Sequence, residues 1–118
     1  MIRPGKDIEC IYVYRRAVDF RKQVNGLSAI VQHVMGQNPM SGHLYVFFNR
    51  AARKVKILYW ERNGFVLYSK HLEQDRFALP SSDSDQVQVT GEQLNWLLDG
   101  IDISLIVPHQ ARHYDVAC

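Results

Sequence analysis

The spacing of apolar residues changes along the chain and separates strand-like from helix-like segments. Residues 11–14, Ile-Tyr-Val-Tyr, are β-branched and aromatic and predict a short strand. Apolar residues then recur at intervals of three and four, which predicts a helix that ends at Gly36. Asp19 is a candidate N-cap for a single turn before this helix. The apolar positions are Leu27, Ile30, Val31, Val34 and Met35.

From Leu44 onward the apolar period is two, which predicts three consecutive antiparallel strands over residues 44–48, 54–61 and 65–72. Asn63-Gly64 is typical of a type I′ turn. A two-residue loop there pairs Trp60 with Leu67 and Arg62 with Phe65. One face of this hairpin is mostly apolar, and we expect it to pack against the first helix. The opposite face is expected to meet solvent, and it carries Lys54, Lys56, Trp60, Arg62 and His71.

The last third of the chain predicts one more strand and one more helix. Val87 and Val89 alternate with glutamine, and residues 90–93, Thr-Gly-Glu-Gln, fit a capping box. Leu94, Leu97 and Leu98 then share a helical face, and Gly100 supplies a stop. A final strand over 101–107 is a further candidate.

The predicted fold class is α+β. We expect one small domain over residues 1–108, in which an antiparallel sheet packs with two helices, and a C-terminal tail over 109–118. The sheet would be a meander of three central strands with short flanking strands. A chain of 118 residues suits one core of this kind.

The chain shows no apolar run near the roughly 20 residues that a membrane-spanning helix needs, and its N-terminus does not resemble a signal peptide. We therefore expect a cytoplasmic protein with no membrane partner. In that compartment Cys10 and Cys118 are expected to be free thiols.

The formal net charge of +2 hides a strong asymmetry. Residues 12–70 contain ten lysines and arginines but only Asp19 and Glu61 as acids, whereas residues 71–118 contain eight acids against Arg76 and Arg112. Separated charge of this kind indicates a polyanionic partner for the first part and a basic protein partner for the second.

Two groups of residues are candidates for binding nucleic acid, because cations neutralise phosphates and flat rings stack on bases. The first group lies on the expected outer face of the hairpin and in the turn before it: Lys54, Lys56, Trp60, Arg62, Arg50 and Arg53. The second precedes the first helix, where cations oppose the helix dipole and gain little for stability: Arg15, Arg16, Arg21 and Lys22. The alternative is a solvated face whose tryptophan packs on a neighbouring element.

Signals for catalysis or metal binding are weak. His109 and His113 have a helical metal spacing but no second ligand cluster, and Ser41-Gly42-His43 lacks a nucleophile elbow. No phosphate-binding glycine loop is present, and the acids are not gathered for a two-metal centre. We predict no catalytic residue, no metal and no cofactor.

Several blocks of the chain, in order over about residues 9–102, match the motifs of one protein family. Asp19-Phe-Arg-Lys22, Gly26-Leu27 and Val31-Gln32 resemble its D-M-R-K…G-L…V-Q signature. Pro39-Met-Ser-Gly-His-Leu-Tyr-Val-Phe47 with Asn49-Arg50 resembles its P-x-S-G-H-L-F-V-F-x-N-R block. Thr90-x-x-Gln93-Leu94 with Leu97, Leu98 and Gly100-Ile-Asp102 resembles its closing L-T-x-x-Q-L-x-x-L-L-x-G-I-D.

On these motifs the chain resembles the TnpB-type accessory proteins of bacterial insertion sequences in the IS-sixty-six group. The resemblance implies a non-catalytic role in DNA transposition beside a separate transposase, with DNA, the transposase and other proteins of the same element as partners. The alternatives are a protein adaptor that does not bind DNA and, less favoured, an enzyme that uses His43. One departure from the pattern is Ala51-Ala52, where the family usually has a glycine or another turn residue.

Overall fold

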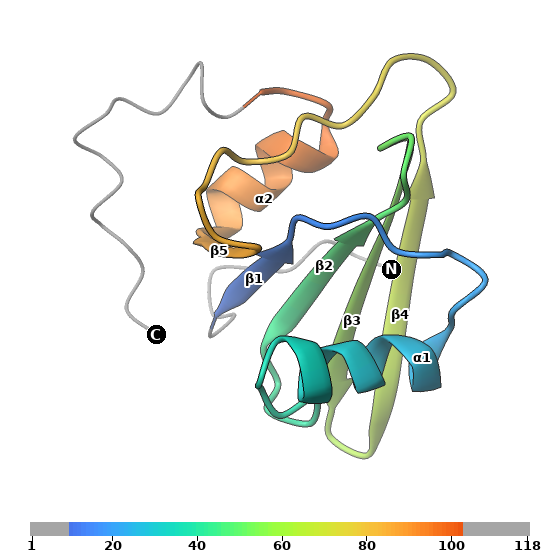
Figure 1. Ribbon diagram of the computed structural model, residues 1–118, viewed down its shortest axis with the longest axis vertical. Helices are drawn as coiled ribbons and strands as arrows, with labels where there is room; N and C mark the ends of the chain where they lie inside the picture. The colour runs from blue at the N-terminus through green and yellow to red at the C-terminus, as the bar shows by residue number, and fades with distance from the viewer. Residues whose placement is uncertain (1–9, 103–118) are drawn as a thin grey trace.

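The central strand of the sheet is buried on both faces. A computed structural model describes residues 10–102 and arranges five strands in the order β4-β3-β2-β1-β5 (Figure 1). All five side chains of the middle strand, β2, are buried, as its uninterrupted apolar run requires. The strands are β1 (Ile11–Tyr14), β2 (Leu44–Phe48), β3 (Lys54–Glu61), β4 (Gly64–His71) and β5 (Gln86–Val89).

Pairing in the sheet confirms the α+β class and adds one parallel pair. The β2–β3, β3–β4 and β1–β5 pairs are antiparallel, whereas β1 and β2 are parallel. Parallel neighbours need a long crossover connection. Residues 15–43 provide it, and they contain α1 (Val24–Ala29) followed directly by a π-helical turn, η1 (Ile30–Val34).

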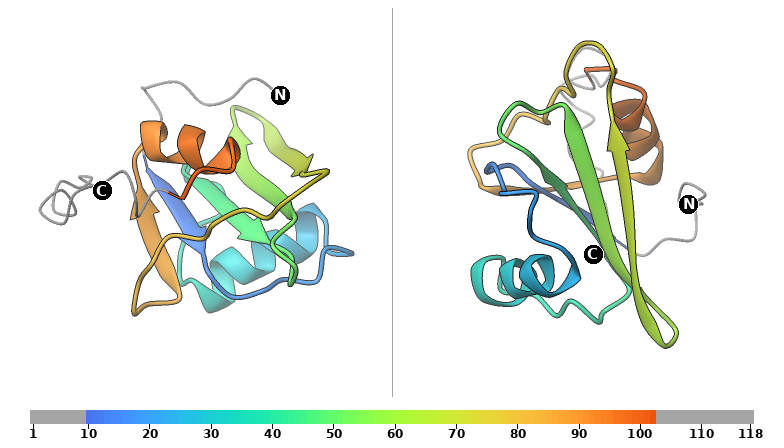
Figure 2. Two further views of the ribbon diagram at one scale, coloured as in Figure 1. Left: turned by 90° about the horizontal axis from the view of Figure 1, so that it is seen from above. Right: turned by 90° about the vertical axis from the view of Figure 1, so that its right-hand side faces the viewer.

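The two helices lie on opposite faces of the sheet (Figure 2, right). α2 (Gly91–Leu98) covers the face that carries Val55 and Ile57, and α1 covers the face that carries Leu58. We expected the apolar face of the β3–β4 hairpin to pack against the first helix. This expectation is wrong, because that face packs against α2.

The register of the β3–β4 hairpin differs by two residues from the prediction. Trp60 pairs with Phe65 and Glu61 with Gly64, so the loop is Arg62-Asn63 rather than Asn63-Gly64. Arg62 takes the positive φ, 53°. Because side chains alternate with a period of two, this shift leaves every residue on its predicted face.

The isolated turn predicted before the first helix is present. Asp19 accepts the backbone N–H of Arg21 with its carboxylate and that of Lys22 with its carbonyl, and α1 itself begins after the N-cap residue Gln23. At the other end Gly36 adopts a φ of 69°, as a helix-ending glycine does. The π-helical turn rotates Val34 away from the sheet, and Val34 is 61% exposed although its spacing predicted burial.

The second helix confirms its predicted signals. The Thr90 hydroxyl accepts a hydrogen bond from the Gln93 backbone N–H, and the Thr90 backbone N–H donates one to the Gln93 side chain, which completes the capping box.

Cys10 is buried and disulfide-bonded, so the expected free thiol is wrong. No helix within residues 10–102 has the length and apolar character to cross a bilayer. Most of the candidate strand over 101–107, the tail and both of its histidines lie outside the described residues.

Candidate nucleic-acid interface

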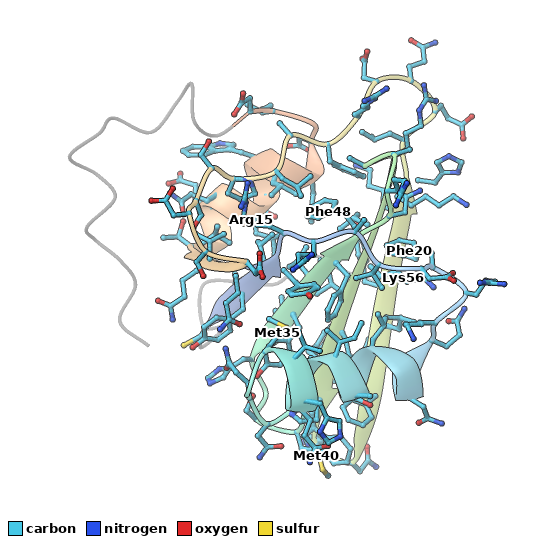
Figure 3. The ribbon with its side chains drawn as sticks, in the orientation of Figure 1. Arg15, Phe20, Met35, Met40, Phe48 and Lys56 are labelled. Atoms are coloured by element: carbon cyan, nitrogen blue, oxygen red, sulfur yellow. The ribbon has the colours of Figure 1, made fainter. Side chains whose placement is uncertain are left out.

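Lys56 is buried and acts as a tether inside the protein. Only 7% of the residue is exposed, and its Nζ donates to the carbonyls of Phe20 and Lys22 at 2.9 and 3.0 Å. The ammonium also lies 4.9 Å from the centre of the Phe20 ring (Figure 3). Burial lowers the pKa of Lys56, and the charge of Lys54 adds to the shift. Two of the three N–H donors of this buried ammonium bind carbonyls of the chain, so Lys56 is not presented to a phosphate as an exposed lysine would be.

The expected exposed surface that joins cations to an indole ring is therefore not formed. The turn around Phe20 and helix α1 cover the middle of that face, where Lys56 and Leu58 lie. Trp60 is half-buried and packs edge-on against Phe65, with ring centres 5.1 Å apart. Lys54 and Arg62 are eight positions apart on the hairpin, roughly 26 Å for extended chain. Trp60 and Arg62 thus lie at the opposite end of the hairpin from Lys54.

Two segments that carry exposed cations, residues 21–22 and 50–54, are both fastened to the same part of the sheet. The segment before α1 lies against the β2–β3 loop, because the N–H of Val18 donates to the carbonyl of Phe48 and Lys56 holds the next residues. Five exposed side chains from the two segments define what we call the basic edge: Arg21, Lys22, Arg50, Arg53 and Lys54. They come from both of the predicted groups.

Asn49 shapes the loop that carries three of these cations. Its Oδ1 accepts the backbone N–H groups of Arg53 and Lys54, each at 3.0 Å, and its carbonyl accepts the N–H of Ala52. Ala52 takes a positive φ of 56°, at the place where the family pattern has a turn residue. Asn49 of the Asn-Arg motif therefore has a structural role in this loop.

The charge of the basic edge is partly balanced. Arg21 binds Asp19 at 2.6 Å, and hydrogen bonds from the Arg21 side chain and backbone lower the pKa of the Asp19 carboxyl to about 2. Exposed Glu73 and Asp75 lie in the segment whose ends bond to the β2–β3 loop. Lys22, by contrast, is exposed and follows directly after the Arg21–Asp19 ion pair in the chain.

Arg15 and Arg16 do not join the basic edge. Arg15 donates from its guanidinium to the carbonyls of Pro80, Ser82 and Ser84 at 2.8, 2.9 and 3.3 Å, so it fastens the loop before β5. Arg16 lies 3.6 Å from Asp85 in an exposed ion pair. The sequence had placed both with Arg21, but they serve another part of the molecule.

The Ser41-Gly42-His43 motif forms a polar corner rather than a catalytic pair. The Ser41 hydroxyl lies 3.0 Å from the Tyr45 hydroxyl and accepts the backbone N–H of His43 at 3.2 Å. The His43 ring packs edge-on against Tyr12, and its buried Nδ1 has no hydrogen-bond partner among the described residues. A serine nucleophile needs an imidazole base in hydrogen-bond contact, and this geometry does not supply one. Within residues 10–102, no three acidic, histidine or cysteine side chains gather as metal ligands would.

Comparison with known proteins identifies the family. A family model described as IS66 Orf2 like protein matches residues 9–107. The chain belongs to the IS66 Orf2-like family. It is also 30% identical over 102 residues to two proteins of Sinorhizobium fredii (strain NBRC 101917 / NGR234), Uncharacterized protein y4hO and Uncharacterized protein y4jC. These matches cover 86% of this chain and 88% and 86% of the two relatives. No solved structure matches the chain.

Membership in the IS66 Orf2-like family implies an accessory role associated with an insertion sequence. The family is not a known catalytic one. Two of the motif segments quoted above, Asp19–Lys22 and Asn49-Arg50, lie in the segments that carry the basic edge.

Proposed function

We propose that this protein is a non-catalytic accessory factor in DNA transposition that binds duplex DNA through the basic edge. The observation that carries the proposal is the tether of Lys56, which fastens the segment with exposed Arg21 and Lys22 to β3, the strand that begins with exposed Lys54 after the β2–β3 loop. Lysine and arginine side chains neutralise backbone phosphates without reading the base sequence. Such binding suits a partner of the transposase that holds DNA rather than cuts it.

The proposal narrows the residues that contact DNA. Arg50 and Arg53 project from the β2–β3 loop and Lys54 from the start of β3, and Asn49 holds the backbone of this segment, so the three cations are presented on an ordered support. Trp60 and Arg62 lie at the other end of the hairpin, and the proposal does not include them among the residues that contact DNA.

A salt titration of duplex binding tests this function. If about four phosphates are contacted, the logarithm of the affinity falls with the logarithm of salt concentration with a slope of about −3.6. Replacing Arg53 and Lys54 together by glutamine should reduce the steepness of this slope by about two. Arg62→Gln is the matched control, because it removes one exposed cation at the far end of the same hairpin and should leave the slope unchanged. A slope that responds to Arg62 and not to the double variant contradicts the proposal.

The competing function is an adaptor that docks on the transposase of the element without touching DNA. The stretch from Glu73 to Asp102 favours it, since seven acids stand there against Arg76 alone and could meet a basic surface. Co-purification with the transposase separates the two. An adaptor retains the transposase and shows no affinity for duplex even at low salt, whereas a DNA-binding factor loses duplex affinity in the double variant.

A further inference from the structure

Strand β4 forms one edge of the sheet, and its outer side is available for pairing. Among the described residues no element lies over this edge, which faces the viewer in Figure 2 (right). The strand has eight residues, all in register with β3 and without a bulge. The opposite edge, β5, has only four residues.

The hydrogen bonds of the hairpin show which backbone groups of β4 point outward. The N–H of Leu72 donates to the carbonyl of Arg53, so Leu72 faces β3. In an antiparallel pair successive residues alternate between facing the partner strand and facing away. Residues 66, 68 and 70 therefore bond to β3, while the N–H and C=O groups of Phe65, Leu67, Ser69 and His71 point to the open edge.

This edge lacks the features that normally protect an exposed strand. Proteins blunt long edges with proline, bulges or outward charges. Residues 64–69 contain no charge and no proline. The charge of Lys70 is directed elsewhere, because its Nζ donates to the carbonyl of Leu98 at the end of α2 at 2.7 Å.

From this geometry we propose that β4 pairs antiparallel with β4 of a second copy of this chain, centred on Leu67. Only residues whose N–H and C=O groups point outward can bond to the other copy. A two-fold axis at Leu67 pairs Leu67 with Leu67 of the other copy, and Phe65 with Ser69 of the other copy. The charges are also compatible, since Lys70 then meets Gly64 of the other copy and no like charges face each other. Residues 65–69 have no charge with which to attract a charged partner strand. The equally uncharged segment of a second copy therefore fits this edge better. The result is a continuous ten-stranded sheet.

Sedimentation of the full chain over a range of concentrations tests the pairing, with two substitutions at one position. Ser69→Pro removes an outward N–H that no bond to β3 uses, as an edge strand tolerates. Ser69→Ala keeps that N–H and removes only the hydroxyl. We expect the parent chain and Ser69→Ala to dimerise, and Ser69→Pro to dimerise about thirty-fold more weakly or not at all, because each dimer loses two hydrogen bonds of about 1 kcal/mol. Equal thermal unfolding of the two variants shows that the fold is kept.

Hydrogen exchange on the unmodified chain supplies a second measurement that does not depend on folding of the proline variant. The amides of Phe65, Leu67 and Ser69 should exchange more slowly as protein concentration rises, while those of Val66 and Tyr68 are protected at every concentration. A chain that stays monomeric at high concentration overturns the inference. A Ser69→Pro dimer as tight as that of Ser69→Ala also overturns it. A chain that stays monomeric is the outcome expected if β4 instead pairs with a strand of another protein.

Discussion

Replacement of Lys56 by methionine measures how much the buried ammonium stabilises the fold. Methionine keeps the length of the side chain but removes two hydrogen bonds to the carbonyls of Phe20 and Lys22 and the contact with the Phe20 ring. Hydrogen bonds to charged groups contribute about 1.5–3 kcal/mol each. Part of that is offset, because the variant no longer desolvates a charge and because both carbonyls can reach water near the surface. We expect a net loss of about 2–3 kcal/mol in the free energy of unfolding.

For a domain of this size such a loss lowers Tm by roughly 10 °C. Thermal and urea unfolding followed by circular dichroism measure it. Lys54→Met is the matched control, because Lys54 lies two positions away on the same strand face but is exposed, and it should change stability by less than about 0.5 kcal/mol. In the DNA titration Lys54→Met should reduce the steepness of the salt slope by about one, because it removes one exposed cation. If Lys56→Met unfolds like the parent chain, the tether does not hold the turn and the basic edge has no structural basis.

Three further substitutions test local features. Ala52→Gly should raise the free energy of unfolding by about 0.5–1 kcal/mol, because glycine takes the positive φ of 56° without strain, and a lower Tm would show that the loop does not need this conformation. Thr90→Ala should cost about 1 kcal/mol by removing the cap that Thr90 shares with Gln93, and unchanged urea unfolding would contradict this value. Asp19→Asn should flatten the fall in stability at acid pH. The folded pKa of Asp19, about 2, is below the ordinary 3.8, so its stabilising contribution is complete above about pH 4 and is lost as pH falls through about 2. An NMR titration of Asp19 with a midpoint near 4 would refute the ion pair with Arg21.

Local chemistry in the sequence predicted most elements. The strands at 11–14, 44–48 and 54–61 agree with the structure, and the capping box at Thr90 is confirmed in detail. Two errors were local ones. The pairing register of the β3–β4 hairpin differs by two residues, and the π-helical turn exposes Val34. Neither error could be avoided from apolar spacing. A register shift by two leaves each side chain on the same face of the sheet, and the spacing of apolar residues does not distinguish a π-helical turn from an α-helical one.

The sequence also contained a signal for the main error. All five residues from Leu44 to Phe48 are apolar, which is typical of a strand covered on both sides, and this pattern indicates one helix on each face. Read that way, the face with Lys56 would have been expected to lie beneath a helix rather than to meet solvent. The position of Lys56 at the margin of the first helix, next to Phe20, still depends on the parallel crossover from β1 to β2.

The sequence alone determined which residues form strands and helices and which side of a strand each side chain occupies, because these follow from periods of two and 3.6 and from turn and cap residues. It determined the family as well. Only the tertiary structure decided which helix covers which face, and hence that Lys56 is buried while Lys54 is exposed. Two lysines on one face of one strand look alike in a periodic pattern, and they differ only because a segment more than thirty residues away closes over one of them.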